Sequence, residues 1–277
     1  MADVVIGLSS AHAPMMSADP GSAPLQQRER FFAALDLVRD RLVDSGAQAI
    51  VMLSGEHFSN FFLDNLPQLS VGLGTSHVGP VERWLGIDRV EVPGDPALAA
   101  AVLAGTIERG FQPALSHRLV VDHGFMTVYH HLSPDASLPM VPVVMNCTTP
   151  PLMTLRHCYD FGRALGESIR AYTGLERVAV CGAGGLSHFV GEPRVGDIDE
   201  EFDRWFLAML EAGSPDELLD LPNEELALAG NGTGEVRSWV AVAGAMRGSR
   251  TTALAYEPIY EWINGMGVVL HEPVAGS

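Results

Sequence analysis

Continuous runs of hydrophobic residues alternate along the chain with segments in which hydrophobic residues recur every three or four positions. Runs of the first kind are typical of strands buried on both faces, and they predict strands at Val4–Leu8, Ala49–Ser54, Gln68–Gly74, Met140–Asn146, 177–185, 251–260 and 265–271. The second kind is typical of helices with one buried face, and it predicts helices at 25–46, 95–110, 154–172, 197–213, 221–230 and 231–246. This alternation predicts an α/β fold, a single-domain α/β/α sandwich with a mostly parallel central sheet covered by helices on both faces.

Local signals mark the starts of two of these helices. Asp95 and Pro96 supply an N-cap followed by a proline in the first helical position. The helix that contains Glu235 is expected to begin at a cap formed by Thr233 or a neighbour. No internal repeat, low-complexity block or long linker divides the 277 residues. We therefore predict one domain over residues 1–277.

Acidic residues outnumber basic ones, 34 to 17, and the formal net charge is −17. This balance argues against binding to nucleic acid or to an anionic membrane surface, because both need a basic footprint. It leaves open a small anionic substrate, since one or two local arginines can dominate a pocket. The chain has no apolar run of the roughly 18–20 residues that span a bilayer. Its first residues, MADVVIGLSS, carry an acidic residue where a secretory signal is basic, so we expect a cytoplasmic protein.

The three cysteines, Cys147, Cys158 and Cys181, include no CxxC pair. A sparse, odd set of this kind fits a reducing cytoplasm and excludes a cysteine-rich zinc or iron–sulfur site.

Histidines follow the ends of three predicted strands. His12 lies in SSAHAP after the first strand, His57 lies in SGEHFSNFF after the second, and His188 follows the strand at 177–185. Ligand sites of open α/β sheets form at the carboxyl ends of the strands, so the three side chains are candidates for one site. A single histidine in such a place is more often a hydrogen-bonded core or loop residue, but three equivalent positions favour a shared site.

The segment VAVCGAGGLSH allows two interpretations of its glycines. Glycine-rich turns after strands bind phosphate through backbone N–H groups. Alternatively, the turn brings the backbone close beneath a pocket and places His188 at its floor. The segment lacks the lysine and the spacing of a phosphate loop.

Glu235 and His123 are further candidates for chemistry. Glu235 opens the helix in GEVRSWVAVAGAM, where the helix dipole favours an ionised carboxylate. Two imidazoles and one carboxylate form the set that leaves positions open on non-haem Fe(II), although an ordinary first-turn glutamate looks the same in sequence. His123 lies in VVDHGFMTVYHH beside Asp122, which either orients the imidazole or caps the helix that follows.

Five motifs together resemble one known family. SSAHAP, GEHFSNFF, VDHGFMTV, GAGGLSHF and TGEVRSWVA occur in the order found in the class III (LigB-type) extradiol ring-cleavage dioxygenases. The resemblance covers nearly the whole chain and implies that residues 1–277 form one catalytic domain. It implies Fe(II)-dependent opening of a substituted catechol by O₂ next to the diol, with a semialdehyde-type product.

The resemblance also implies roles for individual residues. His12, His57 and Glu235 are similar to the Fe(II) ligands of the family. His188 is similar to its acid/base, and His123 to the histidine that hydrogen-bonds substrate or oxygen intermediates. The glycines would then serve to deliver His188, with no phosphate involved.

The match mixes two branches of the family. The segment after His188 is closer to the protocatechuate 4,5-dioxygenase branch, and the segment around Glu235 is closer to the 2,3-dihydroxyphenylpropionate 1,2-dioxygenase branch. Glu56 stands where members commonly have aspartate. The protocatechuate branch works with a small helical partner subunit, so such a partner is compatible with the resemblance, although the chain carries no domain of that kind. We also expect a homo-oligomer.

Arg194, in GEPRVG, is the candidate for holding an anionic substituent of the substrate. It follows His188 by six residues in a chain poor in basic residues. The alternative is a salt bridge to Asp197, Asp199 or Glu200. At the level of function, the alternatives are a metal-binding protein of the same fold without oxygenase activity and a zinc-dependent ring-opening enzyme or hydrolase.

Overall fold

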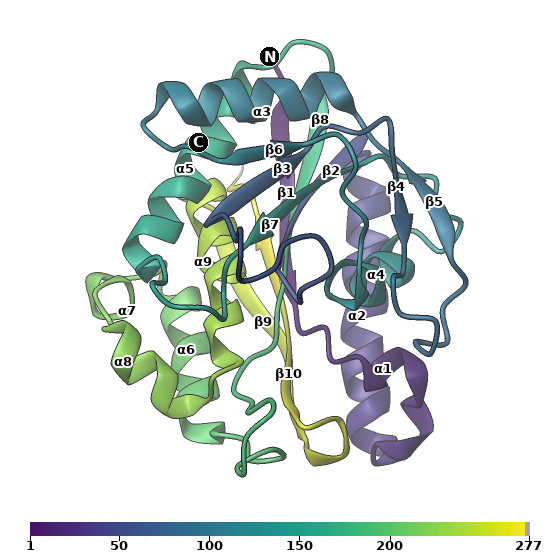
Figure 1. The fold of residues 1–277 in the computed structure, drawn as a ribbon, viewed down its shortest axis with the longest axis vertical. Helices are drawn as coiled ribbons and strands as arrows, with labels where there is room; N and C mark the ends of the chain where they lie inside the picture. Colours follow the sequence, from purple (N-terminus) through teal and green to yellow (C-terminus); the bar gives the residue numbers. More distant parts are fainter. Residues whose placement is uncertain (275–277) are drawn as a thin grey trace.

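The central sheet of the computed structural model has eight strands in the order β6-β3-β7-β2-β8-β1-β10-β9 (Figure 1). Residues 1–274 are described, so the predicted domain end at Ser277 lies outside the described residues. The strands are β1 (Asp3–Ser10), β2 (Ala49–Gly55), β3 (Leu69–Gly72), β6 (Ala114–Ser116), β7 (Met140–Met145), β8 (Arg177–Ala183), β9 (Arg250–Ile259) and β10 (Asn264–Glu272). A separate antiparallel pair consists of β4 (Ser76–Gly79) and β5 (Val90–Pro93).

Helices cover both faces of this sheet (Figure 1). On one face α9 packs against β1 and β8 and is covered by α5, which also contacts α3; on the other, α2 and α4 pack together over the same central strands. The helices are α1 (Met15–Ala18), α2 (Leu25–Ser45), α3 (Pro96–Glu108), α4 (His123–Leu132), α5 (Leu155–Ala171), α6 (Glu200–Glu211), α7 (Asp216–Leu219), α8 (Asn223–Leu226) and α9 (Val236–Ala245). The predicted α/β class, with its mainly parallel covered sheet, is confirmed. Within residues 1–274, no helix combines the length and apolarity needed to cross a membrane.

The parallel register at the centre of the sheet positions the site. β8 lies between β1 and β2 and runs parallel to both. Ala183, the last residue of β8, is paired with Ser10 on one side and with Ser54 on the other. Because the three strands end level with one another, the loops that follow them emerge side by side. These loops carry His12, His57 and His188.

Several local expectations differ from the structure. The predicted strand Gln68–Gly74 is reduced to the four residues of β3, and no hydrophobic run predicted β4, β5 or β6. All three are short and lie at the margin of the fold, where few residues need to be apolar. Thr233 does not cap α9. It opens a 3₁₀ turn, Thr233–Glu235, whose last residue precedes the helix.

Candidate active site

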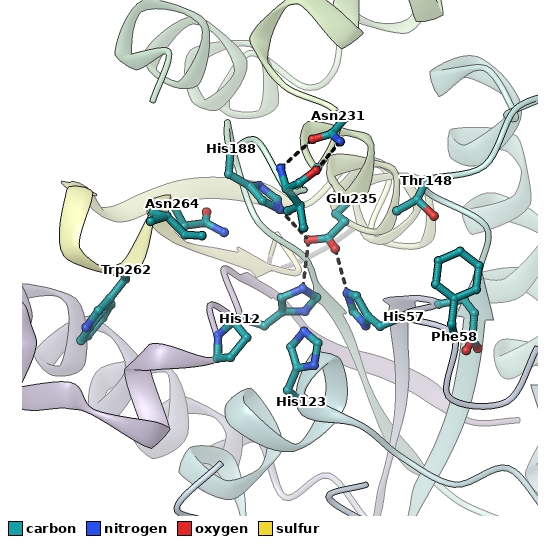
Figure 2. Close-up of a pocket in the computed structure, with 15 residues that line it drawn as sticks. His12, His57, Phe58, His123, Thr148, His188, Asn231, Glu235, Trp262 and Asn264 are labelled. Atoms are coloured by element: carbon teal, nitrogen blue, oxygen red, sulfur yellow. Dashed lines mark hydrogen bonds and ion pairs between the residues drawn. The ribbon is translucent and has the colours of Figure 1, made fainter. Parts of the chain in front are cut away.

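A cavity of about 480 Å³ opens where β1, β2 and β8 end (Figure 2). This volume lies within the range of small-molecule sites. The five residues expected to bind metal or to act in catalysis all line it: His12, His57, His123, His188 and Glu235. The sequence therefore identified side chains that meet in space, although they are spread over more than 200 positions of the chain.

His12 is fixed by a backbone contact on the side facing away from the cavity. Its Nδ1 lies 3.0 Å from the carbonyl oxygen of Gly124, which can only accept, so Nδ1–H is the donor. Its Nε2 lies 2.9 Å from Oε2 of Glu235. The side chain is 3% exposed, so the ring has one orientation, with Nε2 toward the carboxylate.

His57 repeats this arrangement with a carboxylate behind it. Its Nδ1 donates to Oδ2 of Asp122 at 3.1 Å, and its Nε2 lies 2.9 Å from Oε1 of Glu235. Asp122 also caps α4 by accepting the N–H of Gly124 at 3.0 Å, so both roles considered for it are present. The neighbouring imidazole of His57 outweighs the effect of burial and lowers the pKa of Asp122 far below its ordinary value. Asp122 is therefore an anion that orients His57.

Glu235 lies where the two imidazoles converge. Its Oε2 accepts the N–H of Gly185 at 2.6 Å. Burial alone would raise the pKa of Glu235, but the imidazoles of His12 and His57 hold that pKa well below its ordinary value. Both Nδ1 atoms already carry the donated proton, so each Nε2 can lie 2.9 Å from the carboxylate only with a positive charge between them, which a second ring proton supplies in the metal-free protein. A metal cation satisfies that requirement, and each ligating imidazole would have the outer hydrogen bond typical of metal sites.

His123 offers a competing third donor. One ring nitrogen each of His12, His57 and His123 lie within 4.8 Å of one another. The His123 ring centroid is 4.2 Å from that of His57. The donor atoms thus allow either a carboxylate or a third imidazole as the last protein ligand, and the two sets differ in charge.

His188 occupies a space that two glycines leave open. A Cβ on Gly185 would lie 2.5 Å from Cε1 of His188, and a Cβ on Gly232 would lie 2.1 Å from its Nε2. Any side chain at either position would displace the ring. The glycine turn after β8 therefore admits an imidazole, and of the two interpretations of this turn, the structure agrees with the one in which it delivers His188.

The His188 ring is prepared to accept a proton. Its Nδ1 donates to the carbonyl oxygen of Leu186 at 2.8 Å, which leaves Nε2 as the free acceptor. Nε2 is 4.0 Å from Oε2 of Glu235, beyond the distance of a hydrogen bond. Burial, partly offset by Glu235, lowers the pKa of His188 below 6.5, so the ring is neutral at pH 7.

A glutamate that no sequence motif singled out holds His123. Glu82 accepts from Nδ1 of His123 at 2.6 Å with one carboxylate oxygen and from the backbone N–H of His123 at 2.9 Å with the other. This double contact fixes the ring and leaves its Nε2 as the free nitrogen.

We expect Glu82→Gln to lower kcat about 10-fold with little change in KM, because the carboxamide can no longer accept from both N–H groups and the ring loses its fixed orientation. The downfield proton NMR signal of the His123 Nδ1–H should disappear in the same variant. Glu224→Gln, at an exposed position of α8, is the control. An unchanged kcat together with a lost ring-proton signal would show that the orientation of His123 does not matter for turnover.

A buried aspartate supports the segment that leads to His188. Asp203 accepts from the backbone N–H of Ser187 at 2.7 Å, from the Ser187 hydroxyl at 2.8 Å and from the Tyr256 hydroxyl at 2.8 Å. Burial nevertheless raises the pKa of Asp203 from 3.8 to about 6. Between these values the folded state binds more protons than the unfolded state, so this carboxyl makes the protein less stable as the pH rises.

We expect the free energy of unfolding of the wild type to fall relative to that of Asp203→Asn by about 2–3 kcal/mol between pH 4 and pH 6.5. Denaturant titrations of both proteins at several pH values measure this difference. Parallel stability curves over that range would show that Asp203 titrates normally.

Arg194 is not brought into the cavity. Its Nε donates to Oδ2 of Asp197 at 3.0 Å, and its guanidinium lies 3.9 Å from the ring centroid of Phe189. More than half of its side chain is exposed. The salt bridge offered as the alternative is the contact that the structure contains, because Asp197 lies one turn away in the same loop.

The arrangement of these residues matches a known family. A family model described as the catalytic LigB subunit of aromatic ring-opening dioxygenase matches residues 7–267. The chain belongs to the LigB family. The predicted family, and with it the enzyme class of aromatic ring-opening dioxygenases, is confirmed by this match and by similar proteins of known name.

Two proteins similar to this chain are named 2,3-dihydroxyphenylpropionate/2,3-dihydroxicinnamic acid 1,2-dioxygenases. The protein of Paraburkholderia xenovorans is 30% identical, and the alignment covers 96% of each chain. The protein of Cupriavidus necator is 29% identical over 96% of this chain and 97% of its own. A solved structure of an uncharacterized protein from Escherichia coli K12 has a TM-score of 0.63 at 18% identity and covers 96% of this chain and 99% of that one, which shows a shared fold.

The sequence did not predict the residues that hold the histidines of this site in place. Glu82 and Asp203 contact His123 and Ser187 across 41 and 16 positions, and nothing in their local sequence indicates such a contact. Two wall residues, Phe58 and Ile263, have left-handed backbones with φ of 58° and 52°. Such values are rare for bulky residues and are visible only in the structure.

Proposed function

We propose that this protein is a non-haem Fe(II)-dependent extradiol dioxygenase that opens the ring of a substituted catechol with O₂, giving a semialdehyde-type product. The observation that carries the proposal is the convergence of two imidazoles and one carboxylate in a single cavity, with a neutral histidine 4.0 Å away from that carboxylate. His12, His57 and Glu235 would hold the metal. When bound, Fe(II) supplies positions for both catechol oxygens and for O₂ and mediates electron transfer between them.

The protein residues supply proton transfer and orientation. His188 accepts a phenolic proton at Nε2, since its Nδ1–H is already donated to Leu186. The protonated ring then returns that proton to the product. His123, the first residue of α4, is held by Glu82 and hydrogen-bonds the reacting groups through its free Nε2.

The wall of the cavity favours a flat aromatic substrate. Phe58 and Trp262 line it together with the histidines (Figure 2), and Ile263 is a further lining residue. Hydrocarbon surfaces of this kind exclude water from a bound ring and strengthen the electrostatic contacts at the metal.

Oxygen uptake by anaerobically reconstituted protein tests the proposal. The panel contains protocatechuate, gallate, 3-substituted catechols and 2-aminophenol, each with Fe(II) and with Zn(II). We expect one O₂ consumed per ring opened with at least one catechol, together with a visible absorption of the product, for Fe(II) only. Ring opening with Zn(II) would instead indicate a zinc-dependent enzyme. Metal binding without oxygen uptake across the panel would indicate a metal-binding protein of the same fold.

We also propose a cytoplasmic homo-oligomer. Cys147, Cys158 and Cys181 are free and buried, which agrees with a reducing compartment. Large apolar side chains such as Phe62, Leu63 and Trp84 are exposed and support contact with another chain, either a second copy or a small helical subunit. Size-exclusion chromatography with light scattering distinguishes a monomer from the proposed assembly.

A further inference from the structure

The charge of the cavity wall limits which catechol substituent it can accept. We propose that this enzyme selects a catechol with a neutral, apolar substituent and discriminates against an anionic one. The inference rests on the proposed ring-cleavage function and concerns the part of the cavity beyond the metal ligands. It contrasts with the relatives, whose names specify a propionate or a cinnamic acid and therefore a carboxylate on the substrate.

Carboxylates lie in or behind the wall, and no arginine or lysine within residues 1–274 lines it. Glu235 and Glu56 contribute directly to the lining. Asp122 and Glu82 stand immediately behind His57 and His123. One Fe(II) would offset two of these negative charges, and a catechol that has lost one proton would restore one of them. A substrate carboxylate would thus add negative charge where no permanently cationic side chain can pair with it.

Glu56 is fixed in place in the wall. It is 3% exposed, and its Oε1 accepts the backbone N–H groups of Ser59 at 2.5 Å and Asn60 at 2.9 Å. Its Oε2 has no hydrogen-bond partner. The backbone contacts keep this carboxyl group beside the cavity whether or not a substrate is present.

Arg237 and Arg194, which follow Glu235 and His188 in the sequence, make other contacts. Arg237 is 1% exposed and donates to the carbonyl oxygens of Met153 and Gly234 and to Oδ1 of Asn223, at 2.6–2.9 Å. Arg194 is held by the salt bridge and the ring contact described above. If Arg237 moved, its buried acceptors would be left without a hydrogen bond. Arg237 is therefore not available to pair with a substrate anion.

Hydrocarbon side chains form much of the rim of the cavity, beside the polar and exposed Thr148 and Asn231. Phe58, Val190 and Ile263 line the cavity and remain 44%, 54% and 37% exposed, so they form its opening. The left-handed backbones of Phe58 and Ile263 are held there at some conformational cost, which is typical of functional sites. A substituent that extends from the ring toward solvent passes these side chains first and gains from apolar contact.

A matched pair of ligands tests the proposal: 3-(2,3-dihydroxyphenyl)propionate and its methyl ester. We measure kcat/KM with Fe(II)-loaded protein and, without O₂, the Kd of each compound from quenching of tryptophan fluorescence, since Trp262 lines the cavity. We expect both constants to favour the ester by at least about 10-fold. Equal values, or a preference for the acid, would overturn the proposal. If both compounds bind and neither is turned over, the ring-cleavage function fails, and the ratio of Kd values still decides the present proposal.

A second test of the proposal adds a positive charge at the rim of the cavity. The backbone N–H and C=O of Val190 are bonded to Asn231 at 2.8 Å, so a new side chain at this position leaves the loop in place. Val190→Lys should shift the acid-to-ester ratio of Kd values at least about 5-fold toward the acid, and Val190→Gln, of similar length without charge, should not. Equal ratios in the two variants would show that charge at the rim does not determine the preference.

Discussion

His188→Ala is expected to retain metal and to bind catechol, but to lose turnover by about 10²–10⁴-fold, the usual contribution of an acid–base group. The reason is geometric. Nε2 of His188 is the free nitrogen of a buried, neutral ring and lies 4.0 Å from the nearer Glu235 oxygen. It is therefore placed to exchange a proton with a bound phenol without ligating the metal. Steady-state kinetics and metal content, measured on the same preparation, check this result.

Two further variants make the His188 test specific. His188→Phe fills the space between Gly185 and Gly232 and should show the same loss, which separates a missing proton acceptor from a collapsed cavity. His130→Ala, at an exposed position of α4, should retain normal turnover. A near-normal kcat with stoichiometric iron in His188→Ala would contradict the assignment, and His123 would become the better candidate.

Loss of either imidazole ligand should be the most damaging change to the site. In His12→Ala and His57→Ala, Glu235 keeps one imidazole partner, and we expect the remaining donors to hold the metal only weakly. Replacing outer hydrogen-bond partners at metal sites costs 10–100-fold in affinity, so removing a ligand should weaken Fe(II) binding by more than about 100-fold and abolish turnover. Metal analysis after anaerobic desalting measures the loss.

The fold should survive these substitutions, because neither imidazole is part of the apolar core. His12 and His57 lie in loops beyond the ends of β1 and β2. Circular dichroism and thermal unfolding of the metal-free proteins provide the control. Stoichiometric iron in either variant would mean that the metal is bound elsewhere or through other donors.

The sequence predicted the site better than it predicted its surroundings, for a physical reason. Strands buried on both faces are unmistakable as apolar runs, and β1, β2 and β8 are of this kind. Parallel strands place their carboxyl ends together, so the residue after each run, such as His12 or His57, falls at the site without any knowledge of strand order. The order itself, with β8 between β1 and β2, is not encoded in any local pattern.

What the sequence could not predict depends on loop conformation. Glu82 reaches His123 because the loop after β4 folds back over α4, and Arg194 turns to Asp197 instead of the cavity. A charged side chain in a loop pairs with whichever partner the backbone brings near, and its neighbours in sequence do not reveal the result. The absence of basic residues from the described cavity wall is likewise a property of the folded chain.

Anomalous diffraction at the iron edge, from crystals loaded with Fe(II) without O₂, tests the central claim most directly. We predict one iron within about 2.0–2.2 Å of Nε2 of His12, Nε2 of His57 and a carboxylate oxygen of Glu235, with His188 and His123 outside bonding distance. An iron bound by the imidazoles of His12, His57 and His123 with Glu235 unbound, or an iron outside this cavity, would contradict the account.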